Sequence, residues 1–450
     1  MATESSSPSA FAAPSPRLSD DLCCFLDALE RNQSANTAVH MRKGRRQLET
    51  FLLKQHGGAK TFEQVIEKES LQWGEHVDKA NTDKDVRVQQ RPVLMELLPG
   101  LQLVHDIKVG RPGRPDDAVY LKSQYAREWL PRGNCIAKWK TRETTYFFPL
   151  IRGYRKFTGQ EDDGELKKQT GDEEEELSKF FTKPQTQSKW VISTTKENGE
   201  AGHLAVLKRS DGEFVYVLGS KNTHLIAQTV EDIERTQENQ KKEGGNDPFF
   251  AAAPIATSIL RMLFALEPAK LKLLCEFLWQ TRATASFEAA LEHSKCAYQH
   301  EGGVHLFLDE DAAVIGMQKH KSIWYVCLRA IREKAKTFCR TLNSKKPPKG
   351  RAKQLTPKEA LTIGKESVKR RFQAIPGFLH ISNEIANAYE ALGEQFLEYL
   401  FEEELFRGVA AGDEEEEKCK QDARDVADLF PVVWKRFLDH TGASDTIEQR

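Results

Sequence analysis

The sequence predicts an α+β fold built largely of antiparallel sheets, with helical elements before the sheets and an α-helical domain after them. Two patterns predict this class. Short β-branched and aromatic runs, bounded by turn residues, recur between residues 119 and 340. Apolar residues at helical spacing instead characterise residues 18–79, 381–406 and 423–437. We therefore expect a central strand-rich domain with helices on both sides of it in the sequence.

The composition is that of a globular chain with a polar bias, since 39% of its 450 residues are hydrophobic and 30% are charged. The formal net charge of −1 indicates no class of partner. No apolar run approaches the roughly 20 residues that a membrane-spanning helix needs, so we expect no membrane partner. The eight cysteines form no Cys-x-x-Cys pair, which disfavours a zinc ribbon. Their places in apolar runs indicate reduced thiols in an intracellular protein, cytoplasmic or nuclear.

Shifts in composition and charge divide the chain into segments. The expected segments are a disordered tail (1–17), a mostly helical region (18–118), a strand-rich domain (119–340) with an acidic loop (161–183), a basic linker (341–357) and a helical domain (358–450). Within the strand-rich domain, strands are expected from about Tyr120, and helices are expected over 256–281 and 324–338.

A lysine between two strand-like runs organises the strand-rich domain. The run Trp190–Thr195 is followed by Lys196-Glu197-Asn198-Gly199-Glu200 and then by the run His203–Lys208, which predicts a hairpin with Lys196 at its mouth. The Lys-x-x-Gly spacing alone is weak evidence, because it recurs at five other lysines: Lys54, Lys156, Lys168, Lys241 and Lys242. The segments that follow in order carry more weight: Gly219-Ser220-Lys221-Asn222, Phe287-Glu288, Glu301-Gly302-Gly303-Val304 and Lys319-His320-Lys321.

These residue types suit the transfer of a nucleotide to a lysine. The attacking amine must be unprotonated, and cationic side chains must hold the phosphates and the charge that develops on them. Carboxylates suit Mg²⁺, which prefers oxygen ligands and phosphates. Lysines two apart on a strand, such as Lys319 and Lys321, point to the same face and can reach one phosphate.

In this order the segments resemble the motifs of the ATP-dependent RNA ligase family, particularly the phage T4-type RNA ligase and its eukaryotic relatives, within the covalent nucleotidyltransferase superfamily. The resemblance covers roughly residues 132–334. Upstream, Arg132-Gly133 and Arg152-Gly153-Tyr154-Arg155-Lys156-Phe157 resemble signatures that these ligases carry before the nucleophile. The resemblance implies a ligase-type nucleotidyltransferase fold in which Lys196 is adenylylated by ATP.

The resemblance also implies roles for other residues. The nucleotide and its phosphates would be held by Glu197, Asn198, Gly199, Lys221, Glu288, Lys319, Lys321, Arg152, Lys156 and Arg132. Glu301 would hold Mg²⁺. The expected function is ATP-dependent joining of RNA 5′-phosphate and 3′-hydroxyl ends through lysyl-AMP, with ATP, Mg²⁺ and RNA ends as cofactors and partners. His203, His224 and His320 are expected to be structural or solvated.

Two alternatives stay open. The domain can transfer a nucleotide to another acceptor, as capping enzymes and DNA ligases do. It can also be an inactive RNA-binding module, because Asn198 stands where the first motif usually has Asp and the Glu288–Glu301 interval is short. The basic segment Arg332–Arg371, with fourteen Lys or Arg and three acids, fits either an RNA contact or a solvated linker. The RNA substrate, the pathway and the oligomeric state are not indicated.

Overall fold

The computed structural model describes most of the chain from residue 62 to residue 442. The described residues are 62–94, 96–111, 113–140, 144–157, 177–197, 199–242, 247–289, 300–311, 313–342, 354–379, 382–402, 430 and 433–442. They divide into two compact units, each made of two stretches of the chain. The first unit combines residues 1–155 with 201–289, and the second combines residues 156–200 with 290–450. The predicted tail, the basic linker up to residue 353 and the acidic loop before residue 177 lie outside the described residues.

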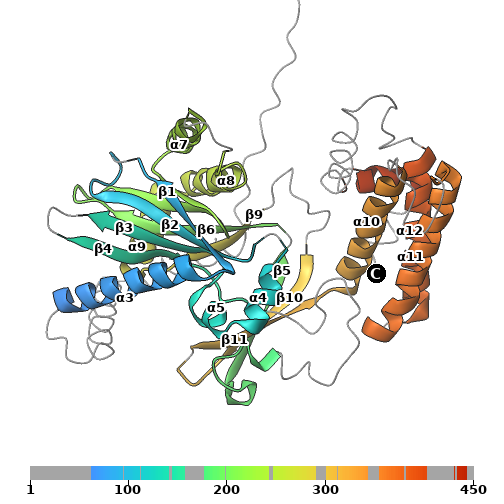
Figure 1. The fold of residues 1–450 in the computed structure, drawn as a ribbon, viewed down its shortest axis with the longest axis horizontal. Helices are drawn as coiled ribbons and strands as arrows, with labels where there is room; N and C mark the ends of the chain where they lie inside the picture. The colour runs from blue at the N-terminus through green and yellow to red at the C-terminus, as the bar shows by residue number, and fades with distance from the viewer. Residues whose placement is uncertain are drawn as a thin grey trace, which may run out of the picture. The chain divides into compact units, whose positions relative to one another are not determined.

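The first unit contains a four-stranded antiparallel sheet in the order β1-β2-β3-β4. Its strands are β1 (Val86–Pro92), β2 (Leu101–Val109), β3 (Asn134–Lys140) and β4 (Thr145–Arg152). Helix α3 (Phe62–Thr82) runs along this sheet and contacts β1 and β4 (Figure 1). The expectation of a mostly helical region over 18–118 is corrected by β1 and β2. Strand β2 is buried on both faces, so its residues do not show the alternation that would have revealed a strand.

Two short helices, α4 (Asp116–Lys122) and α5 (Gln124–Trp129), precede β3. Ser123 ends α4 and begins α5, since its Oγ accepts a hydrogen bond from the amide of Ala126. Tyr120 therefore lies in a helix, and the expectation that strands begin near it was wrong. Its hydroxyl donates to the carbonyl of Leu130, a bond that fixes α4 over the end of α5.

A second antiparallel sheet in the first unit has the order β8-β7-β6-β9. Its strands are β6 (Glu200–Lys208), β7 (Phe214–Ser220), β8 (His224–Ala227) and β9 (Ala285–Ala289). Helices α7 (Val230–Lys242) and α8 (Ala252–Phe264) contact this sheet, and α9 (Pro268–Thr281) follows α8. The single helix expected over 256–281 is thus two helices. Pro268 stands in the first turn of α9, where its missing amide hydrogen is tolerated and where it cannot continue α8.

The two sheets of the first unit share one apolar core. Buried side chains from the first sheet, such as Val104 and Ile151, belong to the same cluster as Ala205, Val217 and Ile226 from the second sheet. The sheets therefore pack face to face, which is how two half-apolar sheets remove their apolar sides from water.

The second unit begins with a three-stranded antiparallel sheet in the order β11-β10-β5. Its strands are β5 (Trp190–Glu197), β10 (His300–Leu308) and β11 (Val314–Lys321). Strand β5 pairs with β10, whereas β6 belongs to a sheet of the first unit. The predicted hairpin around Lys196 was therefore wrong. Turn residues between two strands show that the chain changes direction, but they do not determine which strands form a ladder.

The rest of the second unit is helical, as expected for the end of the chain. Its helices are α10 (Ile323–Leu342), α11 (Pro357–Leu379) and α12 (Asn383–Glu402), and residues 433–441 are also helical. Leu328 and Phe338 of α10 share one buried cluster with Phe372, Phe396 and Phe437. A domain boundary at residue 340 does not fit this core, because α10 packs with the helices that follow it. Among the described residues, no helix is long and apolar enough to cross a membrane.

Candidate functional site

Three lysines lie on one face of the β11-β10-β5 sheet. Lys196 of β5 is opposite Gly302 of β10, which is opposite Lys321 of β11. One row further along, Thr194 is opposite Val304, and Val304 is opposite Lys319. Directly opposed residues and residues two apart share a face of an antiparallel sheet. We call Lys196, Lys319 and Lys321 the lysine face. The sequence placed these residues in one motif set, and the strand register brings them together.

The spacing of this face suits a phosphate group. Strands in a sheet are about 4.8 Å apart, so the backbones of Lys196 and Lys321, separated by β10, are roughly 10 Å apart. Lys319 and Lys321 are about 7 Å apart along β11. Lys321 is buried, with 5% of its surface exposed, and Lys196 and Lys319 are partly exposed. Lys196 Nζ lies 3.2 Å from the carbonyl oxygen of Glu197, to which it donates.

Gly302, which lies between Lys196 and Lys321 in the sheet, has to be glycine for a steric reason. Its φ of +154° lies in a region that side-chain-bearing residues rarely adopt. A Cβ at this position would overlap the carbonyl oxygen of His320 and lie 2.8 Å from the Cα of Lys321. The register of β10 against β5 also shifts between His300 and Gly302, which marks a bulge at the position of Glu301. Bulges change the aim of side chains and are common beside functional sites.

The opposite face of the same sheet carries histidines. The rings of His305 and His320 stack with centroids 5.8 Å apart and planes at 11°. His305 Nδ1 is 2.8 Å from Ser193 Oγ. His320 is exposed and lies beside Gly303, whose missing side chain leaves room for the ring. The direct neighbours of His320 in sequence are the two lysines of β11, so alternation separates the cationic face from the histidine face.

In the first unit, three of the sequence motifs converge on His203. Cβ atoms at Gly133 and Gly153 would both collide with its ring. The amide of Gly133 donates to the carbonyl of Lys221, and His203 Nδ1 is 3.3 Å from the carbonyl of Ser220. The Arg-Gly, Arg-Gly-Tyr-Arg and Gly-Ser-Lys-Asn segments therefore lie side by side. Burial lowers the pKa of His203 to about 4, with a smaller contribution from His224, so His203 is a neutral packing residue at pH 7.

Arg132 and Arg152 are both held by neighbours in the first unit. Arg132 forms ion pairs with Asp116 at 2.7 Å and Asp117 at 3.6 Å. The guanidinium carbon of Arg152 is 4.8 Å from the centre of the Trp73 ring, and its Nη1 donates to a backbone carbonyl at 3.2 Å. Burial lowers the pKa of Arg152 to about 10, with a contribution from the nearby Arg155. Arg152 is thus a desolvated cation stacked on an indole.

The remaining sequence candidates divide between the two units. In the first unit, Lys221 is exposed after β7, and Glu288 is exposed on β9. The argument that Glu288 would be costly to bury therefore does not apply. In the second unit, Lys156 is 5% exposed and Glu197 is exposed at the end of β5. Gly199 is half-buried. Asn198 and the side chain of Glu301 lie outside the described residues.

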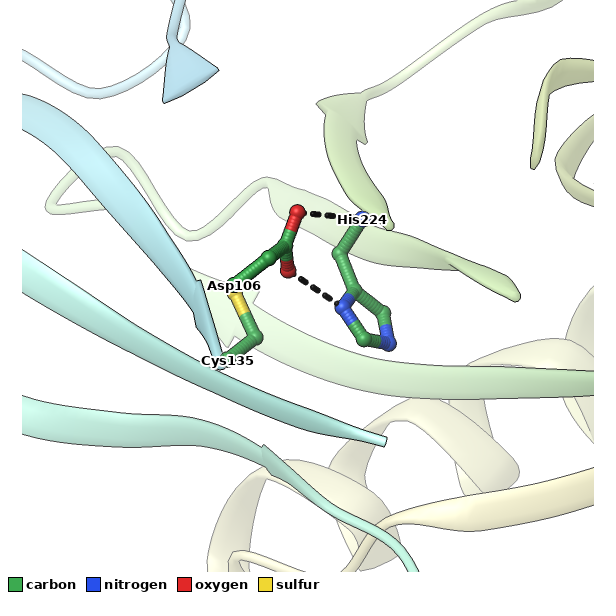
Figure 2. A group of neighbouring side chains, drawn as sticks. All are labelled: Asp106, Cys135 and His224. Carbon is green, nitrogen blue, oxygen red and sulfur yellow. Dashed lines mark hydrogen bonds and ion pairs between the residues drawn. The ribbon is translucent and has the colours of Figure 1, made fainter. Parts of the chain in front are cut away.

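A buried polar cluster that the sequence did not reveal lies between the two sheets of the first unit (Figure 2). Asp106 of β2 accepts from His224 Nδ1 at 2.7 Å and from the His224 amide at 3.0 Å. Cys135 of β3 is the third member, and burial raises the pKa of its thiol, with a further contribution from Asp106. Asp106 and His224 are 1% and 0% exposed. A lone Asp inside the apolar run of β2 was the available sequence signal.

The geometry of this cluster favours hydrogen bonds over a shared metal ion. Two ligands of one zinc ion, each about 2.0 to 2.3 Å from the metal in a tetrahedron, are separated by more than 3 Å. The 2.7 Å between Asp106 Oδ1 and His224 Nδ1 is a hydrogen-bond distance. The cluster therefore joins β2 to β8 as a buried polar contact, and His224 is structural, as expected.

Comparisons with protein-family models, with curated proteins and with solved structures returned no match to this chain.

Proposed function

We propose that this chain is an ATP-dependent RNA ligase that forms a lysyl-AMP intermediate on Lys196. One observation supports the proposal: Lys196, Lys319 and Lys321 occupy one face of a sheet, at a spacing over which their side chains can share a phosphate. Cations fixed in this way stabilise the charge of a phosphoryl group during transfer. The proposal also draws on the motif order in the sequence, in which these lysines belong to separate segments.

The proposed chemistry has three steps. The unprotonated Nζ of Lys196 forms a bond to the α-phosphorus of ATP, the bond from that phosphorus to the bridging oxygen breaks, pyrophosphate leaves, and the amine proton passes to solvent. An RNA 5′-phosphate oxygen then takes the AMP group and frees the lysine. Finally, an RNA 3′-hydroxyl attacks the activated 5′-phosphate, and AMP leaves with the electron pair of the broken bond. Lys319 and Lys321 offset the phosphate charge in the first step.

Mg²⁺ and the base-binding side of the site belong to the proposal as well. Glu301 is the proposed ligand of Mg²⁺, which prefers oxygen ligands, and Glu197, proposed to contact the nucleotide, is a second exposed carboxylate next to Lys196. A bound Mg²⁺ would neutralise part of the triphosphate charge. Lys156, which belongs to the same unit as Lys196, is proposed to contact the nucleotide.

Labelling with ATP that carries a radioactive α-phosphate tests the assignment. The full chain should take up label, and Lys196→Ala should take up none. Lys321→Met, which keeps the volume of a buried side chain but removes its charge, should label at least 10²-fold more slowly, the usual effect of losing one stabilising donor. Lys241→Ala is the matched control, because Lys241 has the same Lys-x-x-Gly spacing on helix α7 and should label normally.

The same assay separates the alternatives. A capping-type enzyme would label with GTP in preference to ATP, and a DNA ligase would seal DNA ends but not RNA ends. An inactive RNA-binding module would bind RNA with a steep salt dependence and take no label. Absence of label on the full chain, or equal labelling of Lys196→Ala, would contradict the proposed function.

A further inference from the structure

Charge is segregated among the helices of the second unit. Helix α10 carries five basic residues and one glutamate, and α11 carries five basic residues and two glutamates. Helix α12 carries five glutamates and no basic residue. The sequence left the basic segment Arg332–Arg371 open between an RNA contact and a solvated linker. The structure shows that the two ends of this segment are helices, packed against each other.

Contacts between α10 and α11 gather several basic side chains at one place. Phe338 of α10 lies against Gly364 of α11, and Lys334 Nζ donates to Ser367 Oγ at 2.8 Å. The contact at the later residue of α10, Phe338, is made to the earlier residue of α11, Gly364, so the two helices are antiparallel. Lys334 consequently lies within one turn of Arg370 and Arg371, and one or two turns earlier on α10 lies Arg329. We call Lys334, Arg370 and Arg371 the basic patch.

Two cations of this patch, Lys334 and Arg371, are partly removed from water and lie near other cations. Burial lowers the pKa of Lys334, and the nearby Arg371 and Arg370 lower it further. Burial also lowers the pKa of Arg371, and Arg329 contributes in the same direction. No ion pair joins Lys334, Arg370 or Arg371 to an acidic side chain among the described residues. Partial burial of like charges is unfavourable until an anion compensates them.

A neighbouring lysine shows the opposite arrangement. Lys365, also on α11, donates to Glu398 of α12 at 2.6 Å and lies 3.9 Å from Glu394. These carboxylates raise the pKa of Lys365. The glutamates of α12 therefore neutralise the side of α11 that faces them and leave the patch uncompensated. The patch differs from an ordinary group of surface lysines because its positive charges are not balanced by ion pairs among the described residues. It is therefore a candidate site for an anion.

We propose that the basic patch binds the phosphodiester backbone of an RNA strand. The inference rests on the proposed function, which makes RNA the substrate. Three cations over neighbouring turns of two helices match a ligand whose charges repeat along a chain, and guanidinium groups pair well with phosphate oxygens. The contact is made to phosphates, so it holds RNA of any sequence and adds affinity away from the reacting ends.

Binding of a fluorescent single-stranded RNA to the full chain, measured by anisotropy at several salt concentrations, tests this site. The double variant Arg370→Gln/Arg371→Gln should bind on the order of tenfold more weakly at 0.1 M salt. Its slope of log affinity against log salt should be smaller by about 1.4, since each phosphate contact to a single strand contributes about 0.7. The control is Arg340→Gln/Lys358→Gln, which removes equal charge from the other end of the same helices and should change neither quantity by as much.

Lysine labelling on the same proteins keeps the two proposals distinct. The patch variant should form the lysyl adduct like the wild type, because the patch is proposed to bind RNA and not ATP. Unchanged RNA affinity and salt slope in a variant that still labels would overturn the patch proposal alone. A patch variant that loses only self-association, seen as a lower mass in light scattering, would also overturn it, because the patch would then receive an acidic α12 from a second copy. A wild type that takes no label would instead count against the proposed function.

Discussion

At the scale of single residues, His203 contributes to the need for glycine at two motif positions, Gly133 and Gly153. Its ring fills the space that a side chain at Gly133 would need, whereas a Cβ at Gly153 would strike the carbonyl oxygen of Arg132 as well as this ring. It is 4% exposed, and its Nδ1 lies near the carbonyl of Ser220. The glycines of the Arg-Gly and Arg-Gly-Tyr-Arg segments are therefore required by packing against a histidine and, at Gly153, against a carbonyl oxygen, in addition to any contact with a ligand.

The neutral state of His203 predicts a pH dependence of stability. Its pKa is about 4 in the folded chain and 6.5 in the unfolded chain, so only the unfolded chain binds the proton between these values. Stability is complete above pH 6.5 and falls as the pH is lowered towards 4. Linkage gives a loss of about 2 kcal/mol between pH 7 and pH 5 from this group.

Hydrogen exchange of the amides in β6 and β7 measures this effect. His203→Gln cannot titrate, so the difference in its opening free energy between pH 7 and pH 5 should be smaller than that of the wild type by about 2 kcal/mol. The comparison within each protein cancels any loss from poorer packing of glutamine. Identical pH dependence in both proteins would show that His203 is already charged or exposed in the folded chain. His76, whose pKa burial lowers to about 4, adds a background with the same sign.

Residue-level prediction from the sequence was uneven for physical reasons. The lysine face was found because its members stand at recognisable positions in short motifs. The Asp106–His224 contact was missed because its partners are far apart in sequence, and only the packing of two sheets brings them together. A carboxylate can be buried in an apolar strand when two groups donate hydrogen bonds to it. A sequence pattern does not show which residues supply those donors.

At the scale of secondary-structure elements, the central strand β10 holds together the three-stranded sheet of the second unit. It pairs with both β5 and β11, and Gly302 lies between two lysines. Because a Cβ at Gly302 would strike the backbone of β11, the strands can keep this register only with glycine there.

Gly302→Ala should therefore destabilise the second unit and disturb the lysine face. Strained backbone alone costs about 1–3 kcal/mol, and the backbone collision adds to it. We expect a lower urea midpoint together with slower adenylylation. Gly212→Ala is the matched control, because Gly212 has φ +92° but open space around its missing side chain. Equal losses from the two substitutions would show that backbone conformation, and not the approach of β11, sets the requirement at Gly302.

The prediction of secondary-structure elements succeeded for helices, which depend on the local apolar spacing. It was wrong for the hairpin, which depends on which strands pair. Helices α10 and α12 were expected from their apolar spacing. The hairpin after Thr195 was wrong because β5 and β6 find partners in different sheets. The break at Pro268 was overlooked because the apolar period continues across it, although proline ends a helix whatever the period is.

At the scale of the whole molecule, the sequence indicated the α+β class but not how the chain divides. It suggested consecutive domains, whereas the chain passes between the two units after residues 155, 200 and 289. Composition changes mark linkers, and these passages occur within ordinary strand-rich sequence. The helical end was expected to begin at residue 358, yet α10 already belongs to its core.

Truncation tests the assignment of α10 to this core. A fragment of residues 1–342 would keep α10 but lose the helices that cover Leu328, Ile331 and Phe338. A fragment of residues 1–322 lacks α10 altogether. We expect the longer fragment to bind more of a hydrophobic dye and to aggregate at lower concentration than the shorter one, since exposed apolar patches promote association. Similar behaviour of the two fragments, with the full chain monodisperse, would contradict the assignment.

The pairing of β5 with β10 also sets an order of events during synthesis. Strand β5 leaves the ribosome long before β10, and the sequence between them builds the second sheet and three helices of the first unit. Until β10 arrives, the chain carries a strand with Trp190, Val191 and Ile192 in its first half and no ladder partner. Pairing between strands far apart in the sequence slows folding and prolongs the exposure of apolar, aggregation-prone segments. We therefore expect the nascent chain to need chaperone protection over this interval, and the lysine face to form only after residue 321 has been translated.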